Sequence, residues 1–121
     1  MTSQDNVAVV IRWLKEAILG NRPELVDELF PETIIVHGKR GEKRQQPREE
    51  RKAYIAGMHA KVENASIVYD DPPMFGDGEF LAARWVTSGT SKETGETKGF
   101  VHNYLYRIRD GRIIEEWQAF F

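Results

Sequence analysis

Residues 106–117 read Tyr-Arg-Ile-Arg-Asp-Gly-Arg-Ile-Ile-Glu-Glu-Trp, and this stretch decides the fold. Asp110 and Gly111 are residue types that adopt the two positive φ angles of a type I′ turn. Strand-forming residues flank the pair on both sides, so the stretch predicts two antiparallel strands joined by a tight turn. Before it, residues 89–100 read Gly-Thr-Ser-Lys-Glu-Thr-Gly-Glu-Thr-Lys-Gly-Phe and predict a longer polar connection between two further strands.

Helices are predicted in the first half of the chain, where apolar residues recur at helical spacing. The charge-rich residues 38–52 predict a solvated loop followed by the third helix. Helices that precede a strand meander predict an α+β fold in which the helices pack on one face of a sheet. The expected elements are helices that start at Ser3 or Asp5, at Pro23 and at Pro47, and strands at 33–37, 65–71, 79–90, 97–109 and 112–120.

Length and composition predict one domain over residues 1–121. The 17 basic and 19 acidic residues give a net charge of −2, which supplies no general attraction to nucleic acid or to an anionic membrane. The basic run 39–52 also contains acids and no interleaved aromatic residues, so no nucleic-acid partner is expected. The absence of cysteine excludes thiol catalysis, and the sequence shows no signal peptide or membrane span, so we expect a cytoplasmic protein.

The order of predicted elements resembles the SnoaL-like family of the nuclear transport factor 2-like superfamily over essentially the whole chain. The resemblance is carried by Gly89-Thr90, Gly95-Glu96, Gly99 and the pattern Arg-x-x-Asp-Gly-Arg-Ile-x-Glu-x-Trp at 107–117. It implies a cystatin-like cone, in which three N-terminal helices pack on a curved antiparallel sheet around a pocket. It also implies a homodimer through the sheet. The family includes polyketide cyclases, and its relatives include ketosteroid isomerase, epoxide hydrolases and non-catalytic ligand or partner modules.

Two ionisable residues of the final hairpin are candidates for acid–base chemistry. A turn at 110–111 is expected to pair residue 102 near residue 119, which would place Glu116 diagonal to His102. An imidazole beside a carboxylate is a common arrangement for a general base at neutral pH. In the cyclases that the chain resembles, an acid on the last strand removes a proton alpha to a carbonyl and a nearby histidine assists. The resemblance implies these roles for Glu116 and His102.

The chain departs from the family at this site. The cyclases use an aspartate as the base, and many relatives carry a further acid after the tryptophan, whereas Trp117 is followed only by Gln-Ala-Phe-Phe. The alternative for Glu115 and Glu116 is therefore that they are solvated or paired with Arg107 and Arg109.

The other two histidines lie far from the hairpin in sequence. His37 ends the first predicted strand, close to where ketosteroid isomerase relatives place their base, and the resemblance implies that it faces the pocket mouth. The alternative is a strand-end histidine that bonds to the backbone. His59 lies on the apolar stripe of the third helix, where a core role is expected. The three histidines lack metal-ligand spacing, so neither a metal nor a cofactor is expected.

Aromatic residues are numerous enough to form walls for a flat apolar ligand, although core and interface packing is the alternative use for most of them. On the strand at 97–109, both alternating faces are half apolar, which predicts that helices cover one face and a partner covers the other. The residues expected to contact a ligand are Trp13, Tyr54, Met58, Tyr104 and Trp117.

The sequence therefore supports three hypotheses. The first is a small-molecule pocket protein that works as a cofactor-free acid–base enzyme, of the cyclase or isomerase type, on an apolar carbonyl compound. His102 and Glu116 would form its acid–base pair and His37 a further group. The second is a non-catalytic ligand-binding or dimerisation module, and a third is an adaptor for a partner protein. Under the first, Glu116→Gln is expected to abolish activity and to leave thermal stability nearly unchanged.

Overall fold

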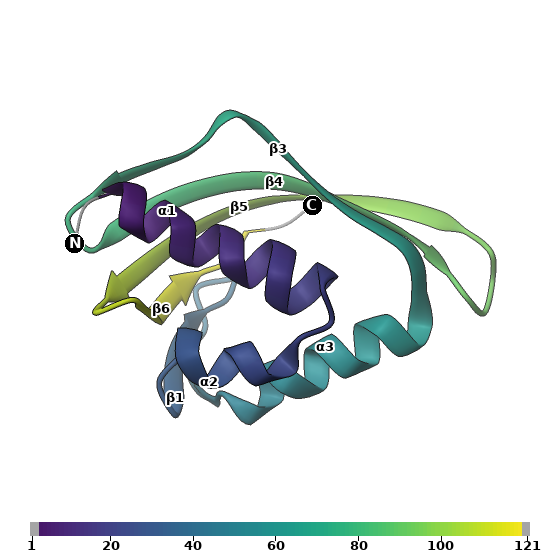
Figure 1. The fold of residues 1–121 in the computed structure, drawn as a ribbon, viewed down its shortest axis with the longest axis horizontal. Helices are drawn as coiled ribbons and strands as arrows, with labels where there is room; N and C mark the ends of the chain where they lie inside the picture. The colour runs from purple at the N-terminus through teal and green to yellow at the C-terminus, as the bar shows by residue number, and fades with distance from the viewer. Residues whose placement is uncertain (1–2, 120–121) are drawn as a thin grey trace.

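The structure, a computed structural model, describes residues 3–119, with side chains described at 5–69 and 74–119. Ser3, one of the two predicted caps of the first helix, has its side chain outside this range. The architecture is a curved sheet with helices packed against its concave face, and it confirms the predicted α+β cone (Figure 1). Six strands form the sheet in the order β2-β1-β6-β5-β4-β3.

The helices follow the predicted boundaries closely. Helix α1 (Ser3–Ile11) continues into η1 (Arg12–Leu19), which has π-helical hydrogen bonding. This long helix ends at Gly20, and it is Asn21 that takes the left-handed conformation, with φ of 55°. A short second helix is formed by η2 (Pro23–Leu25) and α2 (Val26–Leu29), and the third is α3 (Glu49–Lys61).

The strands contain one element that the sequence did not predict. β1 (Thr33–His37) pairs with β2 (Lys43–Pro47), which lies in the segment expected to be a loop. β2 is a polar edge strand in which apolar and polar residues do not alternate, so no sequence pattern predicts it. Its backbone pairing with β1 alone makes it a strand. Pro47 therefore ends a strand and does not start α3. The remaining strands are β3 (Val62–Asp77), β4 (Phe80–Ser91), β5 (Thr97–Arg109) and β6 (Arg112–Trp117).

The pairing of β1 makes the sheet mixed, because β1 runs parallel to β6 while all other neighbours are antiparallel. β3 is longer than predicted, and its antiparallel pairing with β4 contains two register shifts. At the β5–β6 turn, Asp110 and Gly111 have φ of 52° and 76°, which confirms the type I′ turn. A bulge after Arg107 then sets the register, so that Tyr106 lies opposite Glu116 and Leu105 lies opposite Trp117.

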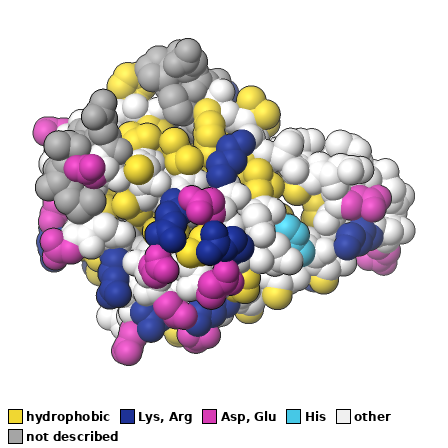
Figure 2. Space-filling view, viewed as in Figure 1, with side chains coloured by type: hydrophobic (Ala, Val, Ile, Leu, Met, Phe, Trp, Pro, Cys, Tyr) yellow, Lys and Arg dark blue, Asp and Glu magenta, His cyan; other side chains and the backbone are white. Residues whose placement is uncertain are grey.

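The two faces of the sheet differ in what covers them. On the concave face, buried residues of β4, β5 and β6 pack against the apolar stripes of the helices and form one core. On the convex face, Val68, Phe75 and Phe80 are exposed to 60%, 68% and 41%. The helix side carries interspersed basic and acidic side chains (Figure 2). Between α2 and α3, ion pairs such as Lys52 with Asp27 neutralise these charges. None of the helices described has the length and apolarity that a membrane span requires.

Candidate functional site

The most unusual feature of the core is a buried ion pair between α3 and β6. Glu116 is wholly inaccessible and Arg51 is 7% exposed, and Arg51 Nη1 lies 2.8 Å from Glu116 Oε1. A glutamine lies at each end of the pair. Gln46 Oε1 accepts a 2.8 Å hydrogen bond from Arg51 Nε, and Gln118 Nε2 donates a 2.5 Å hydrogen bond to Glu116 Oε2.

Two aromatic rings hold the guanidinium of Arg51 in place. Its Cζ atom lies 4.9 Å from the ring centroid of Phe30 and 5.6 Å from that of Trp13. The two rings meet edge to face at 4.8 Å. Contacts of this kind favour a buried cation through the ring quadrupole. Trp13, predicted as a ligand wall, is thus a 4% exposed core residue beneath the ion pair.

The ion pair is incompletely satisfied. Although Nη1 and Oε1 are close, Oε1 accepts no hydrogen bond within the described part of the chain, and Arg51 Nη2 has no hydrogen-bond partner there either. Both atoms are buried. Unsatisfied buried polar atoms are rare in folded proteins and call for a physical explanation.

Two tyrosines of β5 lie near Glu116. Tyr106 lies directly opposite it and is fully buried, and Tyr104 is half-buried on the same face. Burial, with a smaller contribution from the charge of Glu116, raises the pKa of both phenols, so both stay protonated and can donate hydrogen bonds at neutral pH. Tyr54, on α3, is 56% exposed, and burial raises the pKa of its phenol.

His102 shares this face but lies further along β5. Its ring stacks on Trp85 at 5.0 Å, its Nε2 lies 2.9 Å from Thr87 Oγ1, and burial lowers the pKa of the imidazole. The expectation that Glu116 is diagonal to His102 is wrong, because the register places Glu116 opposite Tyr106. Tyr106 lies four residue steps along the strand from His102, which is about 13 Å. Tyr104 stands between them, with ring centroids 5.6 Å from His102 and 5.9 Å from Tyr106.

His37 lies on the opposite face of the sheet, so the expectation that it faces the same pocket is also wrong. It pairs with Trp117 across β1 and β6, and the two rings stack at 4.6 Å. Its Nε2 lies 2.6 Å from Glu115 Oε2, and Glu115 Oε1 lies 3.7 Å from Arg107 Nη1. The alternative considered for Glu115, an ion pair with Arg107, is therefore confirmed, whereas Glu116 pairs with neither hairpin arginine.

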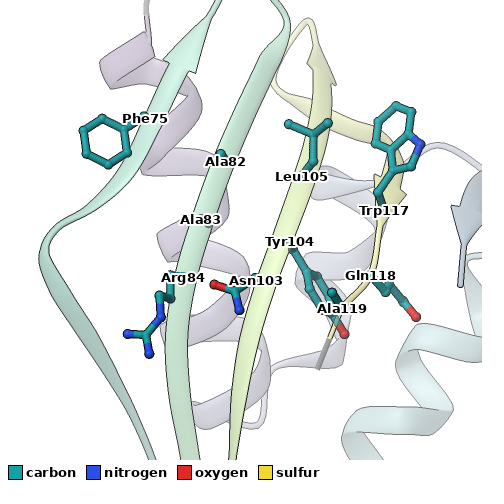
Figure 3. A pocket seen from close by; sticks show the side chains of 10 residues that line it. All are labelled: Phe75, Ala82, Ala83, Arg84, Asn103, Tyr104, Leu105, Trp117, Gln118 and Ala119. Atoms are coloured by element: carbon teal, nitrogen blue, oxygen red, sulfur yellow. The ribbon is translucent and has the colours of Figure 1, made fainter. Parts of the chain in front are cut away.

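The remaining predicted residues are divided between core and surface. His59 Nε2 lies 2.6 Å from the carbonyl oxygen of Ile18, as expected for a histidine satisfied in the core. Met58 packs against the core cluster. Trp117 lines a hollow of about 430 Å³ on the convex face, together with apolar residues of β3, β4 and β5 (Figure 3). Figure 3 also shows Tyr104 projecting from β5 and Gln118 from the end of β6.

Arg51, Gln46 and Gln118 were not predicted from the sequence as site residues. A signal for Arg51 did exist, because it precedes Ile55 and Met58 by four and seven residues and so continues the apolar stripe of the third helix. A charge at such a position must be paired when the stripe is buried. Among the side chains that the structure describes, no group of three or more His, Asp or Glu residues could hold a metal ion.

The comparisons with known proteins agree with this architecture. A family model described as a SnoaL-like domain matches residues 10–116. TsrD from Streptomyces laurentii superposes with a TM-score of 0.82 at 18% identity, covering 99% of this chain and 90% of that one. A SnoaL-like polyketide cyclase from Agrobacterium tumefaciens gives 0.74 at 12% identity, covering 93% and 88%.

A further solved structure identifies the fold. A protein from Catenulispora acidiphila with a ketosteroid isomerase-like fold, crystallised with trimethylamine, gives a TM-score of 0.72 at 20% identity and covers 92% of this chain and 83% of that one. The curved sheet and its helices therefore form a ketosteroid isomerase-like, or nuclear transport factor 2-like, fold. No curated protein sequence matches the chain.

Proposed function

Since the chain belongs to the family of SnoaL-like domains, we propose that it binds a small apolar carbonyl compound on the concave side of the sheet and performs cofactor-free acid–base chemistry on it. The family fixes the scaffold but not the reaction, so the proposal must rest on the site. The observation that carries it is a buried carboxylate, Glu116, whose Oε1 keeps an unused lone pair beside protonated phenols. In this proposal Glu116 accepts a proton alpha to the carbonyl.

Tyr104 supplies the complementary group. Its phenol stays protonated and can donate a hydrogen bond to a carbonyl oxygen, which stabilises the negative charge that develops when the α-proton leaves. His102, neutral because burial lowers the pKa of its imidazole, lies beyond Tyr104 as a second hydrogen-bonding group for a larger ligand. Glu116 is inaccessible as the side chains stand, so the half-buried Gln118 must turn aside when a ligand reaches it.

The proposal predicts catalysis of α-proton exchange. We expect the protein to accelerate deuterium uptake by an apolar ketone such as 2-tetralone, and Tyr104→Phe to reduce the acceleration by about tenfold to a hundredfold. The measurement is the loss of the ketone's α-proton signal in D₂O by NMR. Tyr69→Phe is a matched control, because Tyr69 lies on β3, two strands away from Tyr104, with Lys15 over its ring. Equal acceleration by wild type and Tyr104→Phe would contradict the assigned role.

A second candidate is a non-catalytic ligand-binding module. The ion pair with Arg51 favours it, because the carboxylate of Glu116 already has a structural partner at 2.8 Å. Saturable binding of apolar ketones without any α-proton exchange would support this candidate over the first.

We also propose that the chain forms a homodimer through the convex face of the sheet. The exposed Phe75 and Phe80 and the half-buried Leu105 and Trp117 give this face an apolar character, which favours an interface. We expect sedimentation velocity to show a dimer at micromolar concentration and Leu105→Glu to give a folded monomer. A Leu105→Glu protein that remains dimeric would exclude this face.

A further inference from the structure

The buried ion pair carries information about the ligand, because its two unused atoms have opposite hydrogen-bonding requirements. Among the described residues, Arg51 Nη2 has no acceptor, and Glu116 Oε1, although 2.8 Å from Arg51 Nη1, accepts no well-aligned hydrogen bond. They belong to side chains whose charged atoms already approach to 2.8 Å, so one small group placed beside the pair would reach both. Such a group must accept one hydrogen bond and donate another.

Common ligand groups differ in how well they meet this requirement. A ketone accepts from Arg51 but leaves Oε1 without a donor. A carboxylic acid is ionised at neutral pH, so it lacks a donor and places a second negative charge beside Glu116. A carboxamide is neutral and presents an acceptor oxygen and a donor N–H on neighbouring atoms. It is the group that meets both requirements without adding charge.

The protein itself already uses this chemistry at both ends of the pair. The side-chain amide of Gln46 offers its oxygen to Arg51 Nε at 2.8 Å, and that of Gln118 offers its nitrogen to Glu116 Oε2 at 2.5 Å. Each glutamine satisfies one partner of the ion pair with one of the two polar atoms of its side-chain amide. The atoms left over, Nη2 and Oε1, are the ones that a third amide would join.

We propose that the ligand of this site is a carboxamide, or a lactam, whose C=O accepts from Arg51 Nη2 and whose N–H donates to Glu116 Oε1. The inference rests on the location that the proposed function gives the ligand and not on its acid–base step, because an N–H that donates to Oε1 takes the place of the α-proton there. In this arrangement the side chain of Gln118 covers the ion pair. Its backbone N–H is fixed to the carbonyl oxygen of His37 at 2.8 Å, so only its side chain needs to rotate to admit the ligand.

Three probes of nearly equal shape test the proposal: benzamide, acetophenone and benzoate. We expect benzamide to bind the wild-type protein at least tenfold more tightly than acetophenone, because a missing donor leaves a buried carboxylate oxygen unpaired. Benzoate should bind more weakly than benzamide. Affinities come from calorimetric or NMR titration, and Gln118→Ala should tighten benzamide binding by removing the cover.

The matched control is the double variant Arg51→Met with Glu116→Gln, in which the preference for benzamide over acetophenone should disappear, while Tyr69→Phe should keep it. Should the double variant not fold, the carboxyl ¹³C signal of Glu116 in the wild-type protein decides: saturating benzamide should shift it more than saturating acetophenone, because only the amide has an N–H that donates to Oε1. Equal binding of benzamide and acetophenone would overturn the inference and leave a bound water as the partner of both atoms.

The same titrations separate this inference from the proposed function. Acetophenone that binds at Tyr104 and exchanges its α-protons, without any preference for benzamide, overturns the carboxamide assignment and leaves the acid–base function standing. If none of the three probes perturbs the signals of Tyr104 or Gln118, the concave site itself is wrong, and both proposals fall together.

Discussion

Glu116→Gln is expected to lower the free energy of unfolding by about 3–5 kcal/mol, because it leaves the guanidinium of Arg51 buried without its counter-charge. Urea unfolding followed by circular dichroism measures the effect. The loss is a large part of the 5–15 kcal/mol that stabilises a typical domain. This corrects the expectation from sequence that the substitution would spare stability.

The control for this prediction is a double-mutant cycle. Arg51→Met combined with Glu116→Gln removes both charges, so the double variant should lose much less than the sum of the two single losses. A coupling energy near zero would mean that the two charges do not depend on each other and would contradict the description of the pair. The cycle also matters for activity, because a loss of α-proton exchange in Glu116→Gln is interpretable only while the protein is folded.

Phe30→Ala is expected to cost about 3–5 kcal/mol in unfolding free energy, the range observed when a buried phenylalanine is truncated. Phe30 is fully buried, meets Trp13 edge to face at 4.8 Å, and lies 4.9 Å below the guanidinium of Arg51. The substitution therefore opens a cavity and removes one of the two rings that hold Arg51. Urea unfolding measures the cost.

Phe100→Ala is the matched control, because Phe100 is 46% exposed and its truncation leaves no enclosed cavity. We expect it to stay within about 1 kcal/mol of wild type. Similar losses for the two phenylalanines would contradict the assignment of Phe30 to the core. Phe30→Leu should recover much of the stability, since it refills most of the volume beneath Arg51.

The fold was largely predictable because its signals are local. The turn at Asp110-Gly111 and the helix end at Gly20-Asn21 need only the φ preferences of those residues. The strand at Thr33–His37 was predicted from its β-branched run, and its bounds are those observed. β2 was missed because a polar edge strand shows no apolar period.

The site was predicted less well because it depends on register and on which face each residue occupies. The bulge after Arg107 moves the hairpin pairing, so Glu116 faces Tyr106 and His102 lies about 13 Å away along the strand. His37 was assigned to the wrong face, because the parallel pairing of β1 with β6 that places it beside Trp117 joins segments far apart in the chain.

The sequence by itself determined the order of the helices and of every strand but β2, together with the tight hairpin. These features follow from turn chemistry and from periods of two and 3.6 residues, which act over a few neighbouring residues. Only the tertiary structure decided that Arg51 on α3 meets Glu116 on β6 and that Gln46 and Gln118 flank the pair. That meeting depends on helix-to-sheet packing and strand register, which no local pattern encodes.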